Sequence, residues 1–173
     1  WYHGPADEGV PPTQGTTIPQ PPSEDPSNLK YSWAKAPRYK DLVIEVGPLA
    51  ELVVAEDPLL TAFFRQEGTN VWLRQFARLH RPVVTLQKMR ETILEALKQI
   101  KEPFYFPPKE YAEGEGQGLV QAARGCLGHW IKLKDHHLDH YQIVTPTAWN
   151  ASPRDSADNR GHWEQTLIGT EVQ

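Results

Sequence analysis

The stretch "QAARGCLGHWIKLKDHHLDHYQIVTPTAWN", Gln121 to Asn150, decides the fold class predicted for this 173-residue chain. Two runs of alternating apolar and polar side chains, Leu119 to Leu133 and Leu138 to Thr145, are separated by the polar residues "KDHH". Alternation with a period of two is typical of strands that bury one face. The region therefore predicts a β-hairpin over residues 119–145, although its turn lacks the glycine that tight hairpins favour.

Residues 48–101, which precede this hairpin, carry a helical pattern. Pro48 opens "PLAELVVAED", and proline suits the first turn of a helix. From Thr69 to Lys101 apolar residues recur at heptad-like spacing, and Pro82 predicts either two helices or one bent helix. This apolar stripe consists of Leu86, Met89, Ile93, Leu97 and Ile100. Together with the hairpin, the pattern predicts an α+β fold whose helical segment packs in a larger bundle.

The remaining stretches contain fewer regular elements. Residues 1–30 are rich in proline and predict an extended arm, which leaves residues 31–173 as the domain segment. Residues 31–47 alternate on both sides of Pro37, as short strands would. Residues 102–118 predict a loop because of their proline and glycine content. After the hairpin we expect irregular chain until "HWEQTLIG", which predicts one or two helical turns.

Composition excludes several classes of function. The net charge of −4 and the scattered cations argue against nucleic-acid binding. No window is apolar enough to cross a bilayer, and the first residues do not resemble a signal peptide. The chain carries no address of its own, so its location is left open between the cytoplasm and a membrane reached through a partner subunit. The only methionine is Met89, which indicates a processed product or a fragment.

Most residues that could carry chemistry have a simpler interpretation. The histidines at 136, 137 and 140 predict a solvated turn, because adjacent strand residues point to opposite faces. Cys126 and His129 also lie on opposite faces, which argues against a nucleophile and base pair. A single cysteine excludes an intrachain disulfide and a zinc site of paired cysteines. "GEGQG", Gly114 to Gly118, is too short and acidic to bind phosphate.

Arg124 is harder to explain, because it interrupts a strand pattern between Ala123 and Gly125. On residues alone, an ion pair with an acid is the simplest interpretation. However, "ARGCLGHWI", "YQIVTPTAWNASPRD" and "WEQTLIGT" resemble the C-terminal third of the large subunit of nickel-iron hydrogenases. "YSWAKAPRY" followed by "EVGPLA" is similar to its central segment, and "WY" to an earlier one. The related subunit of complex I has lysine for the arginine and lacks the "GHW" and "TAWN" signatures.

The resemblance implies a cofactor that this chain cannot bind alone. In the family, nickel and iron are bridged by thiolates from two Cys-x-x-Cys pairs, and the iron also carries cyanide and carbon monoxide. Neither pair is present here, since Cys126 is the only thiol. We therefore expect this chain alone to be inactive and to need the remaining large-subunit polypeptide. The resemblance also implies a small subunit that bears iron-sulfur clusters, and H2 as substrate.

The resemblance further assigns residues to the site. Arg124 matches an arginine over the open side of the metals, where a fixed cation or base stabilises the charge that separates when H2 is split. Gly125 lets the backbone approach closely. Thr147 matches a residue whose hydroxyl and N–H bind an iron cyanide, and Pro146 shapes that wall. The carbonyl of Ile143 corresponds to a magnesium ligand in some members.

The family usually has threonine or a similar residue where this chain has Ala148, and often has proline where this chain has Ala123. These two departures leave the details of the pocket open. Lys35 and Arg38 in "KAPRY" are either buried polar supports or salt-bridged surface residues. Two other functions compete with hydrogen oxidation or production. A degenerate or split subunit would serve as a noncatalytic scaffold, and a hydrogen-sensing protein would signal to a kinase.

Overall fold

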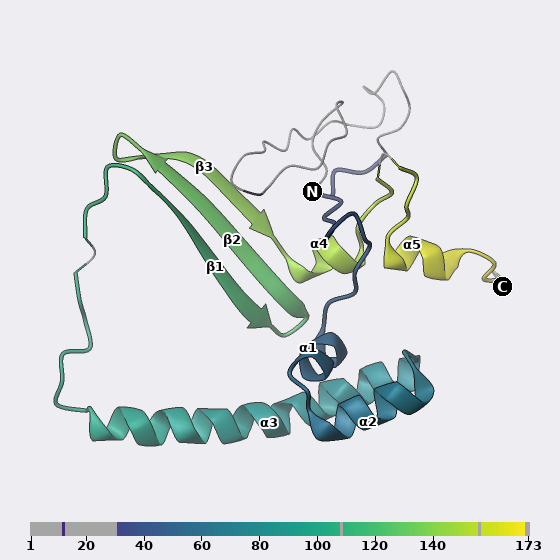
Figure 1. Cartoon of the computed structure of the whole chain (residues 1–173), viewed down its shortest axis with the longest axis horizontal. Helices are drawn as coiled ribbons and strands as arrows, with labels where there is room; N and C mark the ends of the chain where they lie inside the picture. The colour runs from purple at the N-terminus through teal and green to yellow at the C-terminus, as the bar shows by residue number, and fades with distance from the viewer. Residues whose placement is uncertain (1–11, 13–30, 108, 156, 172–173) are drawn as a thin grey trace. The chain divides into compact units, whose positions relative to one another are not determined.

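Figure 1 shows a computed structural model of the chain, which describes residues 12, 31–107, 109–155 and 157–171. The arm expected over residues 1–30 lies, apart from residue 12, outside the described residues. Contacts divide the chain into two units. One unit is helical and spans Pro48–Glu110, and the other joins the residues up to Gly47 to those from Tyr111 onward.

Three helices form the helical unit: α1 (Pro48–Val54), α2 (Pro58–Glu67) and α3 (Val71–Lys98). The helix predicted at Pro48 is confirmed, whereas α2 was not predicted separately. Asp57 caps α2 by accepting hydrogen bonds from two backbone N–H groups, and Asn70 caps α3 through the N–H of Leu73 at 2.7 Å. The helices enclose a small apolar core of Leu49, Leu52, Leu60, Leu73 and Ala77.

Helix α3 is one continuous helix of 28 residues with Pro82 inside it. Of the two predicted outcomes at Pro82, a division into two helices is therefore wrong. Pro82 is exposed, so water can bind the carbonyl that loses its helical partner. Every residue from Pro82 to Lys98 is exposed, and each member of the predicted apolar stripe exposes more than half of its surface. No described helix is both long and apolar enough to cross a membrane.

Three antiparallel strands, β1 (Gly114–Ala122), β2 (Gly125–Lys134) and β3 (His137–Val144), form the sheet of the second unit in the order β1-β2-β3. The predicted hairpin around "KDHH" is confirmed. Its turn uses Asp135 and His136 at φ 51° and 63° in place of glycine, and both residue types adopt positive φ more readily than most. The mixed helices and sheet confirm the α+β class.

Three local predictions in this unit are wrong. Residues 114–118 belong to β1 and not to a loop, because pairing with β2 satisfies their backbone despite three glycines. Residues 31–47 form no strand, only an isolated bridge between Tyr39 and Leu42. Irregular chain was expected after the hairpin, but β3 leads directly into the short helix α4 (Pro146–Asn150), as Figure 1 shows. The turns predicted at "HWEQTLIG" are confirmed as α5 (His162–Leu167).

Candidate functional site

Arg124 lies in a two-residue turn between β1 and β2, not within a strand. Ala122 pairs with Gly125, so Ala123 and Arg124 close the hairpin. The run Leu119–Leu133, predicted as one strand, is thus divided at the arginine. The Arg124 side chain is exposed, and within the described residues its guanidinium has no hydrogen-bond or ion-pair partner. A cation at the end of a hairpin, without an acid beside it, is free to act on a group outside this chain.

The turn rests on the backbone of Val46 and Gly47. Gly125 has φ 130°, a conformation that side chains rarely adopt. A Cβ at this position would lie 2.8 Å from the Gly47 nitrogen and 2.9 Å from Cγ2 of Val46, closer than real Cβ atoms approach. The close approach expected at Gly125 is therefore observed. Only glycine allows the turn to lie this close to residues 46–47.

Thr147 lies in the first turn of α4, directly after the end of β3. Thr145 caps this helix, since its Oγ1 accepts a hydrogen bond from the N–H of Ala148 at 3.3 Å. Pro146 occupies the first helical position and is buried, whereas Thr147 is exposed. Trp149 anchors the other face of the helix in the core. The Thr147 hydroxyl is thus presented outward from a helix that is fixed by its neighbours.

Asn150, at the end of α4, connects this helix to the same backbone segment. Its Oδ1 accepts a hydrogen bond from the N–H of Val46 at 2.9 Å, and its Nδ2 donates to the carbonyl of Val46 at 2.8 Å. The structure therefore brings the turn with Arg124 and the helix with Thr147 to one support, residues 46–47. Sequence reasoning quoted Asn150 in "TAWN" but assigned it no role, because its partner lies 104 residues away.

Lys35 binds the backbone group that was considered for magnesium. Its Nζ donates to the carbonyl of Ile143 at 2.8 Å and to Oε1 of Gln142 at 2.6 Å. Gln142 is buried, and burial lowers the pKa of Lys35 below its usual value. The Ile143 carbonyl thus already accepts from a cationic group of this chain. Gln142 is a second residue of this region that sequence reasoning did not single out.

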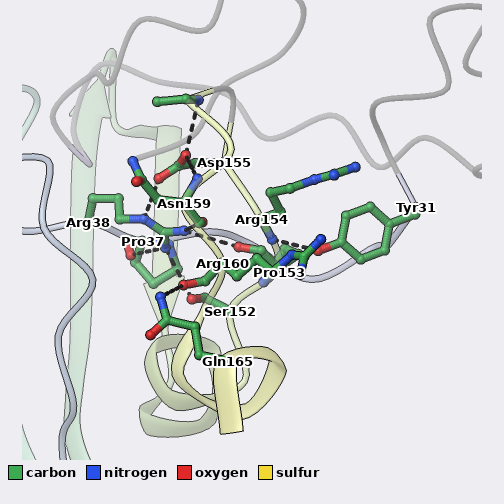
Figure 2. A network of polar contacts seen from close by, with 11 residues as sticks. Tyr31, Pro37, Arg38, Ser152, Pro153, Arg154, Asp155, Asn159, Arg160 and Gln165 are labelled. Carbon is green, nitrogen blue, oxygen red and sulfur yellow. Dashed lines mark hydrogen bonds and ion pairs between the residues drawn. The ribbon is translucent and has the colours of Figure 1, made fainter. Parts of the chain in front are cut away.

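The guanidinium of Arg38 is buried and uses all five of its N–H donors (Figure 2). Nε donates to Oδ2 of Asp155 at 2.7 Å. The other bonds, at 2.8–3.1 Å, reach Oγ of Ser152 and the carbonyls of Pro37, Pro153 and Asn159. Of the two alternatives for Arg38, a buried support is the one observed. The arginine ties residues 37–38 to the chain that follows α4.

Asp155 is held as a carboxylate by this network. Burial alone would raise its pKa, but hydrogen bonds from the Asn159 N–H and from Arg38 outweigh burial and lower the pKa below its usual value. A second contact secures the same region, because the Tyr31 hydroxyl accepts from the N–H of Arg154, as Figure 2 shows, and donates to Glu164. Burial, followed by the bond to Glu164, raises the pKa of Tyr31.

The described residues do not fit a metal centre by themselves. No three His, Cys, Asp or Glu side chains among them gather closely enough to hold a metal ion. Cys126 is half-buried in β2, and one thiol cannot supply the four thiolates of a nickel-iron centre. His136 and His137 lie exposed at the tip of the β2–β3 hairpin. Any such centre would need ligands from other polypeptide.

Comparisons with known proteins agree with the resemblance of the motifs. The profile of the family described as nickel-dependent hydrogenase matches residues 1–173. The chain is 36% identical to the uptake hydrogenase large subunit of Bradyrhizobium diazoefficiens, covering 82% of the chain and 27% of that protein. It is 31% identical to the hydrogenase-1 large chain of Citrobacter freundii, covering 99% of the chain and 34% of that protein. The chain thus spans about a third of the length of the curated relatives it matches.

A solved structure shows the same relationship. The reduced Ni-Fe-Se hydrogenase from D. vulgaris Hildenborough superposes with a TM-score of 0.72 at 34% identity. The superposition covers 99% of this chain and 38% of that one. Sequence and structure agree over nearly all of the chain, which therefore belongs to the nickel-dependent hydrogenase family, as a part of its large subunit.

Proposed function

We propose that this chain is part of the large subunit of a nickel-iron hydrogenase, which cleaves H2 heterolytically and reversibly and passes electrons to a small subunit with iron-sulfur clusters. One observation carries the proposal beyond family membership. The guanidinium of Arg124, unpaired within the described residues, and the outward hydroxyl of Thr147 belong to two elements anchored on one backbone segment, residues 46–47. In this proposal the chain contributes a wall beside the metals, and the thiolate ligands come from other polypeptide.

Arg124 is the residue to which we assign the catalytic role. Splitting a neutral molecule heterolytically separates charge, and a fixed cation in a site shielded from water stabilises that charge more than bulk water does. The arginine meets two requirements for this role, since it is unpaired within the described residues and its turn is supported by close contact at Gly125. The complete subunit would exclude water around it.

Thr147 and Pro146 are proposed to hold a cyanide ligand of the iron. The hydroxyl and backbone N–H of Thr147 lie at the start of α4, where N–H groups have no partner within the helix. Hydrogen bonds to a metal's ligand fix its orientation and withdraw electron density. Pro146 has no N–H and is buried, so it would shape the wall without competing for the ligand.

Magnesium at the Ile143 carbonyl remains part of the proposal in a restricted form. The ammonium of Lys35 already donates to this carbonyl at 2.8 Å. A carbonyl has two lone pairs, so a magnesium ion could bind there only by sharing the oxygen with Lys35 or by displacing it. Lys35 and Gln142 would then be the residues that respond first to the metal.

The test is Arg124→Lys in the complete enzyme that contains this segment. Lysine keeps the charge but carries it on a compact, more strongly hydrated group in a different place. We expect nickel and iron content to stay normal while hydrogen oxidation falls about 100-fold or more, as with the loss of one preorganised donor elsewhere. Near-normal turnover in a metal-replete enzyme would end the catalytic assignment and leave Arg124 a structural role.

Thr147→Val provides the contrast within the same site. It removes a hydroxyl of the proposed cyanide contact and no reacting group. The infrared bands of cyanide should therefore shift, while activity falls less than in Arg124→Lys. Unchanged cyanide bands in a metal-replete enzyme would contradict the assignment of Thr147.

A noncatalytic scaffold is the second candidate function. The observation in its favour is the single cysteine together with the absence of a metal-binding group among the described residues. Elemental analysis of the native assembly distinguishes the two. Nickel and iron in the purified complex support the enzyme, whereas a stable complex without either metal supports the scaffold.

A further inference from the structure

One carboxamide links the helix that carries Thr147 to the turn that carries Arg124. The side chain of Asn150 binds both the N–H and the carbonyl of Val46, at 2.9 and 2.8 Å. Two such bonds to a single residue are what an adjacent antiparallel strand would provide. Val46 lies in a segment without regular secondary structure, so within the described residues Asn150 takes the place of a strand partner.

The same backbone supports the hairpin turn. A Cβ at Gly125 would lie 2.8 Å from the Gly47 nitrogen, and 2.9 and 3.0 Å from Cγ2 and the carbonyl carbon of Val46. The backbone of Gly125 thus packs against residues 46–47 with no room for a side chain between them. A displacement of the Val46 backbone toward the turn is therefore passed on to Gly125 and to its neighbour Arg124.

Strand β1 contributes little packing at this end of the hairpin. Strand β1 is exposed along its length and only Ala122, next to the turn, is half-buried. Gly125, the first residue of β2, is buried. Among the described residues, the position of the turn therefore depends on the 46–47 backbone rather than on packing along β1.

We propose that Asn150 is a positioning residue for Arg124. By holding Val46, it fixes the surface on which the Ala123–Arg124 turn rests. Asn150 also lies three residues after Thr147 on α4, so the same carboxamide sets where the guanidinium stands relative to the Thr147 hydroxyl. The catalytic consequence rests on the proposed function, whereas the geometric part does not.

Two substitutions of Asn150 test the proposal in the complete enzyme with its small subunit and full metal content. Asn150→Leu removes both bonds to Val46. Asn150→Asp keeps the shape and an acceptor for the Val46 N–H, but places a carboxylate oxygen against the Val46 carbonyl. Both should speed deuterium exchange or shift the backbone at residues 46–47, and a crystal structure should show the Arg124 turn displaced. The kcat should fall about 10-fold or more with little change in KM, since a misplacement of about 1 Å can cost about 100-fold.

Gly125→Ala is the second route to the same displacement. Its Cβ would press on the Val46–Gly47 backbone from the turn, without altering Asn150. The same fall in kcat and the same shift at Arg124 are expected. If Asn150→Leu disturbs folding of the enzyme, Gly125→Ala and Asn150→Asp keep the proposal open to refutation.

Thr145→Ala is the matched control. It removes the cap of α4 but leaves both bonds between Asn150 and Val46. We expect slow exchange at Val46, an unmoved turn and a nearly normal kcat. A fall in kcat equal to that of Asn150→Leu would show that any loosening of α4 suffices, and would overturn the proposal.

Two further outcomes separate this inference from the proposed function. If the Asn150 variants leave residues 46–47 protected and Arg124 in place, the positioning role is wrong whatever the activity. If they displace the turn while Arg124→Lys retains normal turnover, the positioning role stands and the catalytic role of Arg124 fails.

Discussion

The two units of the chain are stabilised in different ways. The helical unit has an apolar core formed by α1, α2 and the first part of α3, and its capping bonds join residues close in sequence. The other unit buries few large apolar side chains, and three polar ones, Arg38, Gln142 and Ser152, are buried with them. Several of its side-chain bonds join residues more than 100 positions apart, such as Val46 to Asn150 and Arg38 to the Asn159 carbonyl.

This difference indicates where each unit is vulnerable. A helix that loses one surface contact keeps its local bonds, so damage to the helical unit should stay local. A buried polar network left half-satisfied costs more than the lost bond, because the remaining groups stay buried without partners. The unit that carries the candidate site should therefore respond more strongly to single polar substitutions.

Arg38→Met should have the largest effect on stability. It leaves the half-buried Asp155 carboxylate without its cation and removes donors from three carbonyls. The expected loss is about 3–5 kcal/mol, as for breaking other buried ion pairs. Chemical unfolding of the large subunit measures it.

Lys98→Met is the control for Arg38→Met. It breaks the ion pair with Glu95 on α3, where both side chains are largely exposed. Exposed ion pairs contribute little to folding stability, so the unfolding midpoint should hardly change. Equal losses in the two variants would contradict the contrast between the units.

The second prediction concerns the apolar stripe on α3 and the effect of Ile93→Ala on stability. Ile93 is 56% exposed in this chain, so the substitution should hardly change the stability of the chain alone. If the remaining large-subunit polypeptide covers the stripe in a helical bundle, the same change should cost the complete subunit about 2 kcal/mol, at the low end for a buried isoleucine. Equal effects in both forms would argue against a covered stripe.

Sequence patterns predicted the local elements well and the long-range contacts poorly. The start of α1, the hairpin between β2 and β3, and α5 follow from proline placement and periodicity within a few residues. The first part of β1, residues 114–118, was mistaken for a loop because its three glycines favour a loop locally, whereas pairing with β2 decides the outcome. Helix propensity and turn chemistry are local signals, but strand pairing is not.

The candidate site was also hard to predict from sequence, because its residues depend on long-range contacts. Arg124 and Thr147 were identified only because their motifs resemble a family, since no spacing rule links two residues from separate elements. Asn150, Gln142 and Asp155 were not singled out at all. Their roles depend on partners more than 100 residues away. Arg38 and Lys35 were recognised as candidates, but only the structure shows that Arg38 is buried with every donor used.

Loss of a helix cap in the helical unit should reduce stability by a smaller amount. Asn70→Ala removes the acceptor for the N–H of Leu73 at the start of α3. The expected cost is about 1 kcal/mol, typical of a lost N-cap. Thermal unfolding measures the cost, and deuterium exchange should rise in the first turn of α3 alone. Faster exchange throughout residues 111–171 would contradict the view that damage in this unit stays local.

The smallest loss of stability is expected when the pH is lowered and Asp155 becomes protonated. Its folded pKa lies below the unfolded value of about 3.9, so its stabilising contribution is fully present above that pH and is lost as the pH falls through the folded pKa. The effect is small because burial opposes the hydrogen bonds that lower the pKa. Asp155→Asn should lower stability at pH 6 but make the further loss between pH 5 and pH 3 shallower than in the unaltered protein.

Asp57 is the counterpart of Asp155 in the helical unit. Comparing the two carboxylates at low pH tests whether the two units respond differently. Its pKa is also lowered, chiefly by the hydrogen bond from the N–H of Leu60, so its protonation weakens the cap of α2. Deuterium exchange, corrected for the intrinsic effect of pH, should distinguish the two carboxylates. As the pH falls, Asp57 should loosen residues 58–67 alone, whereas Asp155 should loosen residues 152–160 together with residues 35–38, which its partner Arg38 ties to them. Acid loosening confined to residues 152–160 would show that the buried network does not act as a unit.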